Sequence, residues 1–488
     1  MGTCFFARLA VPSSDNLSWL PRLTGVGNEA MVNTDIVILA AGKGTRMRSS
    51  LPKVLHAVAG KPLLKHVLTA ARTVPNARQI VVVGHGAERI EQAFCADDCL
   101  FVQQAEQLGT AHAVQMALTH VRDNARVLVL YADVPLINPQ TIAKLLDAVS
   151  HGQMSLLTIE REDPSGYGRI VRSQSGEIDA IVEHKDARPD QLDITEVNTG
   201  VLAITAAHLK AWLPLINNQN SQKEYYLTDL IAIARAHGHT VKSVQPLSQI
   251  ETEGINDRLQ LSQVERAYQL QLAHTLLNAG TSLADPARFD VRGTLSAGTD
   301  NFIDVNCVFE GDVVLGSDVI IGPNCSISGS VIGDGVEIKA NSVIESSIIG
   351  DQASVGPFAR LRAGTQLGKG SKIGNFVETK KAQLGKGSKV SHLSYVGDAK
   401  LGDHVNIGAG TITCNYDGVN KHQTTIGHHV FVGSNSTLVS PLTLADGSFV
   451  AAGSTLTRSV DERELGVGRA KQRNISGWTP PREKHKRD

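Results

Sequence analysis

Aliphatic residues recur at every sixth position through much of the second half of the chain. One such series is Ile349, Val355, Leu361, Leu367 and Ile373, and a later one is Ile426, Val432, Leu438, Leu444, Val450 and Leu456. A six-residue period belongs to neither a helix nor an ordinary strand, and it is typical of a repeat architecture. Each hexapeptide is one short strand and a turn. We therefore predict stacked coils from about residue 290 onward that bury one continuous aliphatic core.

One segment interrupts this period. Ile407 and Ile426 are 19 residues apart, one more than three hexads, and turn-forming and polar residues fill the gap at 413–422. A loop that leaves a regular solenoid is often a tolerated decoration, but loops are also where binding residues gather. We therefore treat 413–422 as a candidate functional loop.

Basic residues and a histidine depart from the repeat shortly before that loop. Arg362 stands where the hexad pattern expects Gly, Lys380 and Lys381 follow Glu378, and His392 lies on a predicted repeat strand. A lone His in such a place is often structural, but departures from a repeat are where a site should be sought. Two cations suit a phosphate, and a neutral imidazole suits removal of a proton from an attacking amine.

Apolar runs alternate with helical patterns between residues 31 and 256. The runs at 36–39, 80–83 and 127–131 end in turn-forming or polar residues, whereas 63–74 and 141–149 have helical periodicity. This βαβ pattern predicts an α/β doubly wound domain with a parallel sheet. Ligands of such sheets bind outside the carboxyl ends of the strands.

The first run leads into a glycine-rich stretch, Leu39-Ala40-Ala41-Gly42-Lys43-Gly44-Thr45-Arg46-Met47. Gly42 and Gly44 permit a tight turn and a close approach of the backbone to a ligand. Backbone N–H groups with one Lys and one Arg suit phosphates, although the stretch is neither a Walker A loop nor a dinucleotide-binding motif. A plain turn is the alternative. Asp133 ends another run, and a carboxylate there either caps a helix or holds Mg²⁺.

Composition excludes several classes of partner. A net charge of −1 and 4% aromatic residues argue against a basic field for nucleic acid or anionic membranes and against base-stacking platforms. The longest apolar runs fall short of 18 residues, so we expect no integral membrane association. The six cysteines form no C-x-x-C pair, and we expect free thiols in a cytoplasmic protein.

These patterns divide the chain into four segments. Residues 1–30 make a poor signal peptide, and we expect a disordered extension with Met31 as the natural start. Residues 31–257 are expected to form the α/β domain and residues 281–488 the repeat domain. Between them, Leu and Ala at helical spacing predict one linker helix over 258–280.

The glycine-rich stretch resembles the L-A-A-G-x-G-T-R-M signature of sugar-nucleotide pyrophosphorylases, and the hexads resemble the left-handed parallel β-helix of hexapeptide acyltransferases. Over nearly all of 31–488 the chain resembles the bifunctional bacterial N-acetylglucosamine-1-phosphate uridyltransferase/glucosamine-1-phosphate acetyltransferase family. The resemblance implies acetylation of glucosamine 1-phosphate by acetyl-CoA. The product, N-acetylglucosamine 1-phosphate, is then coupled to UTP, which gives UDP-N-acetylglucosamine and pyrophosphate for peptidoglycan and lipopolysaccharide precursors. It also implies a homotrimer with the acetyl site between subunits.

The resemblance also assigns residues to the uridyltransferase site. The expected nucleotide and sugar contacts are Leu39, Ala40, Ala41, Gly42, Arg46, Lys53, Gln104, Gly109, Thr110, Tyr131, Ala132, Asp133, Gly168, Glu183, Asn198 and Asn256. Of these, Asp133 and Asn256 are expected to hold Mg²⁺. Ala132 stands where the family usually has Gly, and we expect its methyl group to crowd the strand end slightly without abolishing activity.

For acetyl transfer the resemblance makes His392 the general base, with Glu378 in support. The expected contacts to glucosamine 1-phosphate are Arg362, Lys380, Tyr395 and Asn406. The expected contacts to acetyl-CoA are Ala409, Asn415, Tyr416, Ser434, Ala452 and Arg469.

Two alternatives stay open. One is another sugar-1-phosphate nucleotidyltransferase, for glucose or mannose, whose solenoid only assembles or regulates the enzyme. The other is a non-catalytic hexapeptide scaffold. The polar residues Arg362, Lys380 and His392 argue against both, because an assembly module needs none of them.

Overall fold

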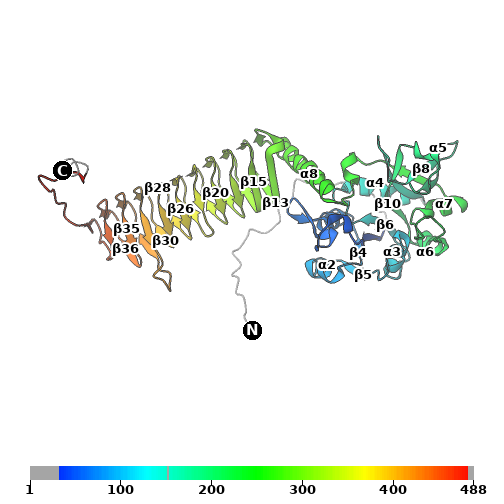
Figure 1. Ribbon diagram of the computed structural model, residues 1–488, viewed down its shortest axis with the longest axis horizontal. Coiled ribbons are helices and arrows are strands. Elements are labelled where there is room, and N and C mark those ends of the chain that lie inside the picture. The colour runs from blue at the N-terminus through cyan, green and yellow to red at the C-terminus, as the bar shows by residue number, and fades with distance from the viewer. Residues whose placement is uncertain (1–31, 151–152, 482–488) are drawn as a thin grey trace.

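The computed structural model describes residues 32–150 and 153–481, so the extension expected at 1–30 lies outside the described residues. An α/β unit forms one end of the molecule and a long β-helix forms the other (Figure 1). Helix α8 (Arg258–Asn278) lies between them, where the linker helix was predicted. Within the described ranges, no helix combines the length and the apolar character that a membrane crossing requires.

The α/β unit is built on a nine-stranded sheet with the order β11-β7-β10-β6-β1-β4-β5, in which β8 also pairs with β10 and β9 pairs with β8. Its strands are β1 (Thr34–Ala40), β4 (Ala77–Val83), β5 (Leu100–Gln103), β6 (Arg126–Tyr131), β7 (Met154–Glu160), β8 (Arg169–Arg172), β9 (Ile178–Val182), β10 (Glu196–Thr205) and β11 (Val241–Val244). Strand β1 pairs in parallel with both β4 and β6. The three predicted apolar runs are therefore confirmed as the central buried strands.

Strand β10 differs from the prediction of a fully parallel sheet, because it runs antiparallel to both β6 and β7. A parallel return requires a crossover connection, usually a helix that packs on the sheet. Between β7 and β10 the chain instead holds the hairpin of β8 and β9 and the four-residue helix α5 (Pro189–Leu192). Apolar runs give no strand direction, so the sequence pattern could not reveal this.

Helices cover both faces of the sheet. They are α1 (Leu63–Ala71), α2 (Ala87–Ala93), α3 (Thr110–Ala117), α4 (Pro139–Ser150), α6 (Ala206–Trp212) and α7 (Asp229–Ala236). Leu64 of α1 and Leu145 of α4 lie in one apolar cluster, whereas Val114 of α3 and Leu230 of α7 lie in the other. The unit is therefore doubly wound, as predicted.

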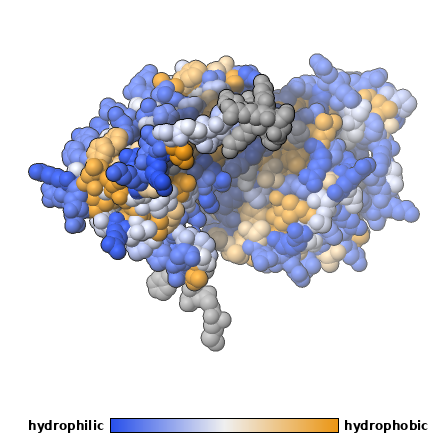
Figure 2. Space-filling view, turned by 60° about the vertical axis from the view of Figure 1, so that its left-hand side comes forward, coloured by the Kyte–Doolittle hydropathy of each residue, from blue (hydrophilic) through white to orange (hydrophobic). Residues whose placement is uncertain are grey.

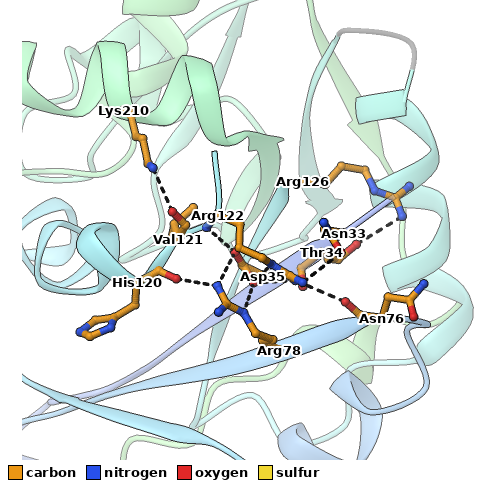
Figure 3. Close-up of polar contacts among 10 residues, drawn as sticks. All are labelled: Asn33, Thr34, Asp35, Asn76, Arg78, His120, Val121, Arg122, Arg126 and Lys210. Carbon is orange, nitrogen blue, oxygen red and sulfur yellow. Dashed lines mark hydrogen bonds and ion pairs between the residues drawn. The ribbon is translucent and has the colours of Figure 1, made fainter. Parts of the chain in front are cut away.

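A charge network around one buried carboxylate holds the amino end of the sheet together (Figure 3). Asp35 is fully buried and accepts hydrogen bonds from Arg78 Nε at 2.9 Å and Arg122 Nε at 3.0 Å. Burial alone would raise the pKa of this carboxyl group, but the hydrogen bonds from Arg78 and Arg122 outweigh it, so its pKa lies below the ordinary value. The network joins β1, β4 and the segment before β6 at the end opposite the glycine-rich stretch.

The repeat region forms an 11-stranded sheet from β12 (Ser282–Leu283) to β39 (Leu465–Gly466) and a 17-stranded sheet from β13 (Phe289–Ala297) to β38 (Thr455–Leu456). The strands of both sheets pair in parallel from coil to coil, and the predicted hexad residues are buried in one continuous cluster. The predicted core is therefore confirmed. Its spacing is less regular than predicted, because the buried residues Thr379 and Leu384 are only five apart. Thr379 is not aliphatic, so the hexad pattern passed over it.

The predicted interruption is a loop that leaves the β-helix between β32 (Ile412–Cys414) and β33 (Thr424–Ile426). The coils stack undisturbed on both sides of it, because Leu401 pairs with Leu384 in one coil and with Ile426 in the next. The loop is therefore an insertion at a corner and leaves the core unchanged.

Helix α8 binds the edge of the β-helix to the α/β unit. The buried amide of Gln269 donates to Val291 O at 2.7 Å and accepts from Val291 N at 2.8 Å. One turn earlier, Glu265 accepts a hydrogen bond from the backbone N–H of Ala59 at 2.7 Å. Ala59 lies in the turn of the small hairpin β2 (Ala57–Val58) and β3 (Lys61–Pro62). The helix thus contacts both folded parts with side chains one turn apart.

Candidate active sites

A cavity of about 230 Å³ lies at the carboxyl ends of β1 and β6. Its lining residues are Leu39, Ala40, Ala41, Gly42, Lys53, Val54, Gln104, Gln107, Gly109, Thr110, Ala113, Tyr131, Asp133 and Glu224. The glycine-rich stretch and Asp133 therefore meet in one crevice, at the edge where the fold class places ligands.

The two glycines of the stretch have different roles. A Cβ at Gly42 would meet nothing within 4 Å, so its backbone is open to the cavity. Gly44 has φ +60°, and a Cβ there would lie 2.8 Å from the Cβ of Lys53. Gly42 fits the predicted approach to a ligand, whereas Gly44 lets the loop pack against the stem of Lys53.

Four polar side chains converge beside the cavity. Lys53 Nζ forms an ion pair with Asp133 Oδ2 and lies 3.3 Å from Asn256 Oδ1. Arg46 donates to the same amide oxygen at 3.0 Å. Asn256 lies two residues before the start of α8, and its backbone N–H donates to Gln260 of that helix at 2.7 Å. The first turn of α8 thus positions a residue of the site.

Asp133 and Asn256 offer a carboxylate and an amide oxygen that contact the same atom, Lys53 Nζ. Mg²⁺ binds one or two protein oxygens and completes its shell with water and substrate phosphates, so this pair fits it. In the described ranges no group of three or more His, Cys, Asp or Glu side chains is arranged to hold a metal.

The predicted sugar contacts form a second group nearby. Asn198 N donates to Gly168 O at 2.9 Å, and a Cβ at Gly168 would lie 3.4 Å from each carboxylate oxygen of Glu183. Burial raises the pKa of Glu183, while a hydrogen bond from Thr228 partly offsets this. Burial raises the pKa of Tyr131 as well, with smaller contributions from Asp133 and Glu183. The charges of Asp133 and Glu183 thus both act on the Tyr131 hydroxyl group.

Ala132 lies away from the cavity. Its side chain is fully buried in the apolar cluster beneath the sheet, and its N–H donates to Leu39 O at 3.0 Å. The methyl group thus packs in the core and does not crowd the cavity.

On the β-helix, His392 has a defined hydrogen-bond partner. It ends β28 (Lys389–His392) directly opposite Asn375, which ends β25 (Lys372–Asn375). The ring Nδ1 and Asn375 Oδ1 are 2.6 Å apart. An amide oxygen only accepts, so Nδ1 carries the proton and the lone pair of a neutral imidazole lies on Nε2. Sequence reasoning missed Asn375, because only the strand register places it beside His392.

His392 belongs to a straight row along the β-helix. Strand pairing aligns one residue from each of four successive coils: Val390, Ile407, Val432 and Val450. The residues two positions after these are, in the same order, His392, Ala409, Ser434 and Ala452. Gly453 N donates to Ser434 O, and Arg469 Nη1 donates to Ala452 O at 2.8 Å. The predicted base and four of the predicted acetyl-CoA contacts thus follow one edge of the β-helix.

Cations gather on the adjoining face. Glu378 of β26 (Glu378–Lys380) faces Tyr395 of β29 (Tyr395–Gly397) and pairs with Arg362 Nη1 at 2.9 Å. Lys421, from the inserted loop, lies against Lys380 and lowers its pKa, and the charge of Arg362 adds to this effect. Three cations near one point suit a phosphate group.

Known proteins resemble the chain over its length. Two relatives, each named "Bifunctional protein GlmU", come from Marinobacter nauticus (56% identical) and Cellvibrio japonicus (58% identical), and each match covers 92% of this chain and 99% of the relative. The chain belongs to the GlmU family. Family models also match: a MobA-like NTP transferase domain over 36–191, a GMPPB C-terminal domain over 292–375 and a hexapeptide repeat of succinyl-transferase over 423–458.

This GlmU-family chain is an enzyme with uridyltransferase and acetyltransferase activities. Membership removes the two alternatives left open by the sequence, a nucleotidyltransferase with an inert solenoid and a non-catalytic scaffold. The hexapeptide match agrees with a left-handed β-helix for the repeat region.

Two predicted acetyl-CoA contacts of this GlmU-family chain lie apart from the row of His392. Ala409 lies in the turn before strand β32, and Asn415 lies in the loop after that strand. Asn415 is buried and donates to Asp398, while Tyr416 is 59% exposed in the inserted loop. One chain therefore does not bring Asn415 and Tyr416 to Ala409, Ser434 and Ala452.

Sequence reasoning also missed part of the nucleotide cavity. Glu224 lines it, because the neighbouring Tyr225 pairs with the glycine turn: Tyr225 N donates to Leu108 O, and Ala111 N donates to Tyr225 O, both at 2.9 Å. Gly109 has φ +123°, and a Cβ there would lie 2.5 Å from Tyr225 O. Glu224 is far from Gly109 in sequence, so no local pattern could have found it.

Proposed function

We propose that the chain makes UDP-N-acetylglucosamine in two separate sites, acetyl transfer within 281–488 and uridylyl transfer within 31–257. The observation that carries this proposal is a pair of unlike clusters that share no residue. One cluster holds Lys53, Asp133 and Asn256 at the carboxyl ends of the central strands, and the other holds His392 and Asn375 on the β-helix.

For uridylyl transfer, the phosphate oxygen of N-acetylglucosamine 1-phosphate attacks the α-phosphorus of UTP in line, and pyrophosphate leaves. The protein contributes position and charge neutralisation. Lys53 and Arg46 supply positive charge. Gln104 offers its amide oxygen to the uracil edge, because its amide nitrogen contacts Gly109 O and His112 Nδ1. Asp133 and Asn256 would hold Mg²⁺, which would neutralise phosphate charge. Glu183, Asn198 and Gly168 contact the acetylamino sugar.

For acetyl transfer, Nε2 of His392 accepts a proton from the amine of glucosamine 1-phosphate. The nitrogen forms a bond to the thioester carbon of acetyl-CoA and the carbon–sulfur bond breaks. His392 then passes its proton to the departing sulfur, so CoA leaves as a thiol. The Nδ1–H bond to Asn375 supports this role, because it leaves Nε2 as the acceptor. Arg362, Lys380 and Tyr395 hold the sugar phosphate. Asn406 contacts the same substrate from β31 (Asn406–Ile407), the strand that pairs with the strand of His392.

We infer a homotrimer in which the loop of one subunit completes the row of the next. Within one chain, Asn415 and Tyr416 lie a strand away from Ala409, which favours a site shared between subunits. The exposed rings of Phe358 and Phe376 also stack, with their centroids 5.3 Å apart, and Phe376 directly follows Asn375. These apolar rings suit burial against a second copy of the chain. Figure 2 shows such hydrophobic patches on the β-helix end that faces forward. Because UTP and acetyl-CoA are cytoplasmic metabolites, we place the enzyme in the cytoplasm.

Assays of both activities on His392→Ala and Asp133→Ala test the two-site proposal. His392→Ala should slow thiol release from acetyl-CoA by about 10²–10⁴-fold and leave UDP-N-acetylglucosamine formation intact. Asp133→Ala should do the reverse. If either variant loses both activities while keeping its thermal stability, the sites are not separate. Normal thiol release by His392→Ala would refute the base assignment.

A further inference from the structure

Protein cations contact both oxygens that we propose for Mg²⁺. Lys53 Nζ contacts Asp133 Oδ2 and Asn256 Oδ1, and Arg46 donates to the same Asn256 oxygen at 3.0 Å. One ammonium group therefore lies where the two oxygens converge. This inference rests on the proposed function, which places the metal between these oxygens.

We propose that Lys53 is a resident counter-ion that competes with the divalent metal for Asp133 and Asn256. Entry of the metal displaces the ammonium group, which then turns to the phosphates of the nucleotide. Lys53 thus has two successive partners, the carboxylate before binding and the phosphate after it.

The surroundings make this ion pair stronger than an ordinary surface pair. The side chains of Lys53 and Asp133 are only 12% and 21% exposed, so water screens their attraction weakly. A carboxylate in such a place needs a cation nearby. An ammonium group and a divalent ion that contact the same two oxygens repel each other at close range, which disfavours their binding together.

The packing of Lys53 allows its end to move while its base stays fixed. The glycine-rich stretch packs against the Lys53 Cβ at Gly44. Beyond Cβ, the flexible stem carries a point charge that changes direction easily, unlike a planar guanidinium group. Lys53 also lines the cavity, so a turn of the stem brings Nζ toward a bound triphosphate. We therefore expect weak metal binding alone and tight binding with the nucleotide.

Binding of Mn²⁺ to the full chain without nucleotide tests the competition, with electron paramagnetic resonance reporting free Mn²⁺. Lys53→Met keeps the length of the side chain and removes its charge, so it should bind Mn²⁺ about tenfold more tightly than the unaltered chain. Lys53→Arg keeps the charge and should bind as weakly as the unaltered chain. Thermal unfolding checks each variant, and Lys53→Gln replaces Lys53→Met if the latter does not fold.

The double variant Lys53→Met/Asp133→Asn should lose the gain in Mn²⁺ binding. No gain in the folded single variant, or a gain that persists in the double variant, overturns the counter-ion role. Failure of the proposed metal site gives a different result: Asp133→Asn would then leave the Mn²⁺ dependence of UDP-N-acetylglucosamine formation unchanged. If that dependence needs Asp133 but Lys53→Met shows no gain, only the counter-ion proposal is wrong.

Discussion

The α/β unit and the β-helix place their polar clusters in opposite ways. In the α/β unit, Lys53, Asp133 and Asn256 come from distant parts of the chain and meet at the carboxyl ends of the central strands. On the β-helix, Asn375, His392 and Ala409 occupy equivalent positions on successive coils. The first cluster depends on tertiary convergence, whereas the second depends on an unbroken register of strands.

The two regions also differ in the polar side chains that they bury. The α/β unit buries the charged side chains of Asp35, Arg169 and Glu251. Among the described residues of the β-helix, the buried polar side chains are all Ser, Thr or Asn. We therefore expect loss of one charge to damage the first region most and loss of stacking geometry to damage the second.

The largest effect is expected from Asp35→Asn, which leaves Arg78 and Arg122 without their shared carboxylate. Asp35 is fully buried, but water reaches the side chains of Arg78 and Arg122, so we expect a loss of about 2–3 kcal/mol, below the cost of breaking a fully buried ion pair. The unfolding midpoint reported by the buried Trp212, which lies in the same unit, should fall accordingly. Asp312→Asn, at an exposed position on the β-helix, is the control and should change stability little. Equal destabilisation by Asp35→Asn and Asp312→Asn would contradict the expectation that the α/β unit depends more on single charges than the β-helix does.

Acid should weaken the α/β unit through protonation of Asp35. The pKa of Asp35 is lower in the folded chain than in the unfolded chain, so its contribution is present above the unfolded pKa and is lost as pH falls through the folded pKa. Denaturant unfolding between neutral and acidic pH should show a stability loss that Asp35→Asn reduces. An identical pH dependence in that variant would remove Asp35 from the explanation.

Gly374→Ala tests the dependence of the β-helix site on stacking. A Cβ at Gly374 would lie 1.8 Å from Ser391 O, so the coil beneath His392 must move. We expect about 1–3 kcal/mol of destabilisation together with loss of acetyl transfer. Gly370 has φ +66° but open space around it, so Gly370→Ala should cost about 1 kcal/mol and preserve acetyl transfer. Thermal unfolding and thiol release measure both effects.

Asn375→Ala should have the smallest effect, confined to catalysis. Without Asn375 Oδ1, nothing selects the ring form of His392 that leaves Nε2 unprotonated, and we expect kcat for acetyl transfer to fall by about 10–100-fold. KM for glucosamine 1-phosphate should change little. Asn375→Asp keeps an acceptor and should retain most activity. A change in KM without a change in kcat would show that Asn375 acts in another way. An equal loss of kcat in Asn375→Ala and Asn375→Asp would show the same.

Sequence reasoning worked where a signal is local. The apolar run at 36–39 became β1, the leucine pattern at 258–280 became α8, and the hexad residues became the core of the β-helix. It failed for the direction of β10, because an apolar run is the same in either direction. It also passed over Asn375 and Glu224, because their importance comes from neighbours that are distant along the chain.

The sequence by itself determined the two folds, because glycine turns, apolar runs and a six-residue period are short-range patterns that each allow few structures. Only the tertiary structure decided which polar groups meet. Strand register placed Asn375 against His392, and the entry of α8 brought Asn256 to the ion pair of Lys53 and Asp133. Hydrogen bonds and ion pairs act over a few ångströms, so partners far apart in sequence are fixed only when packing sets the coordinates of both.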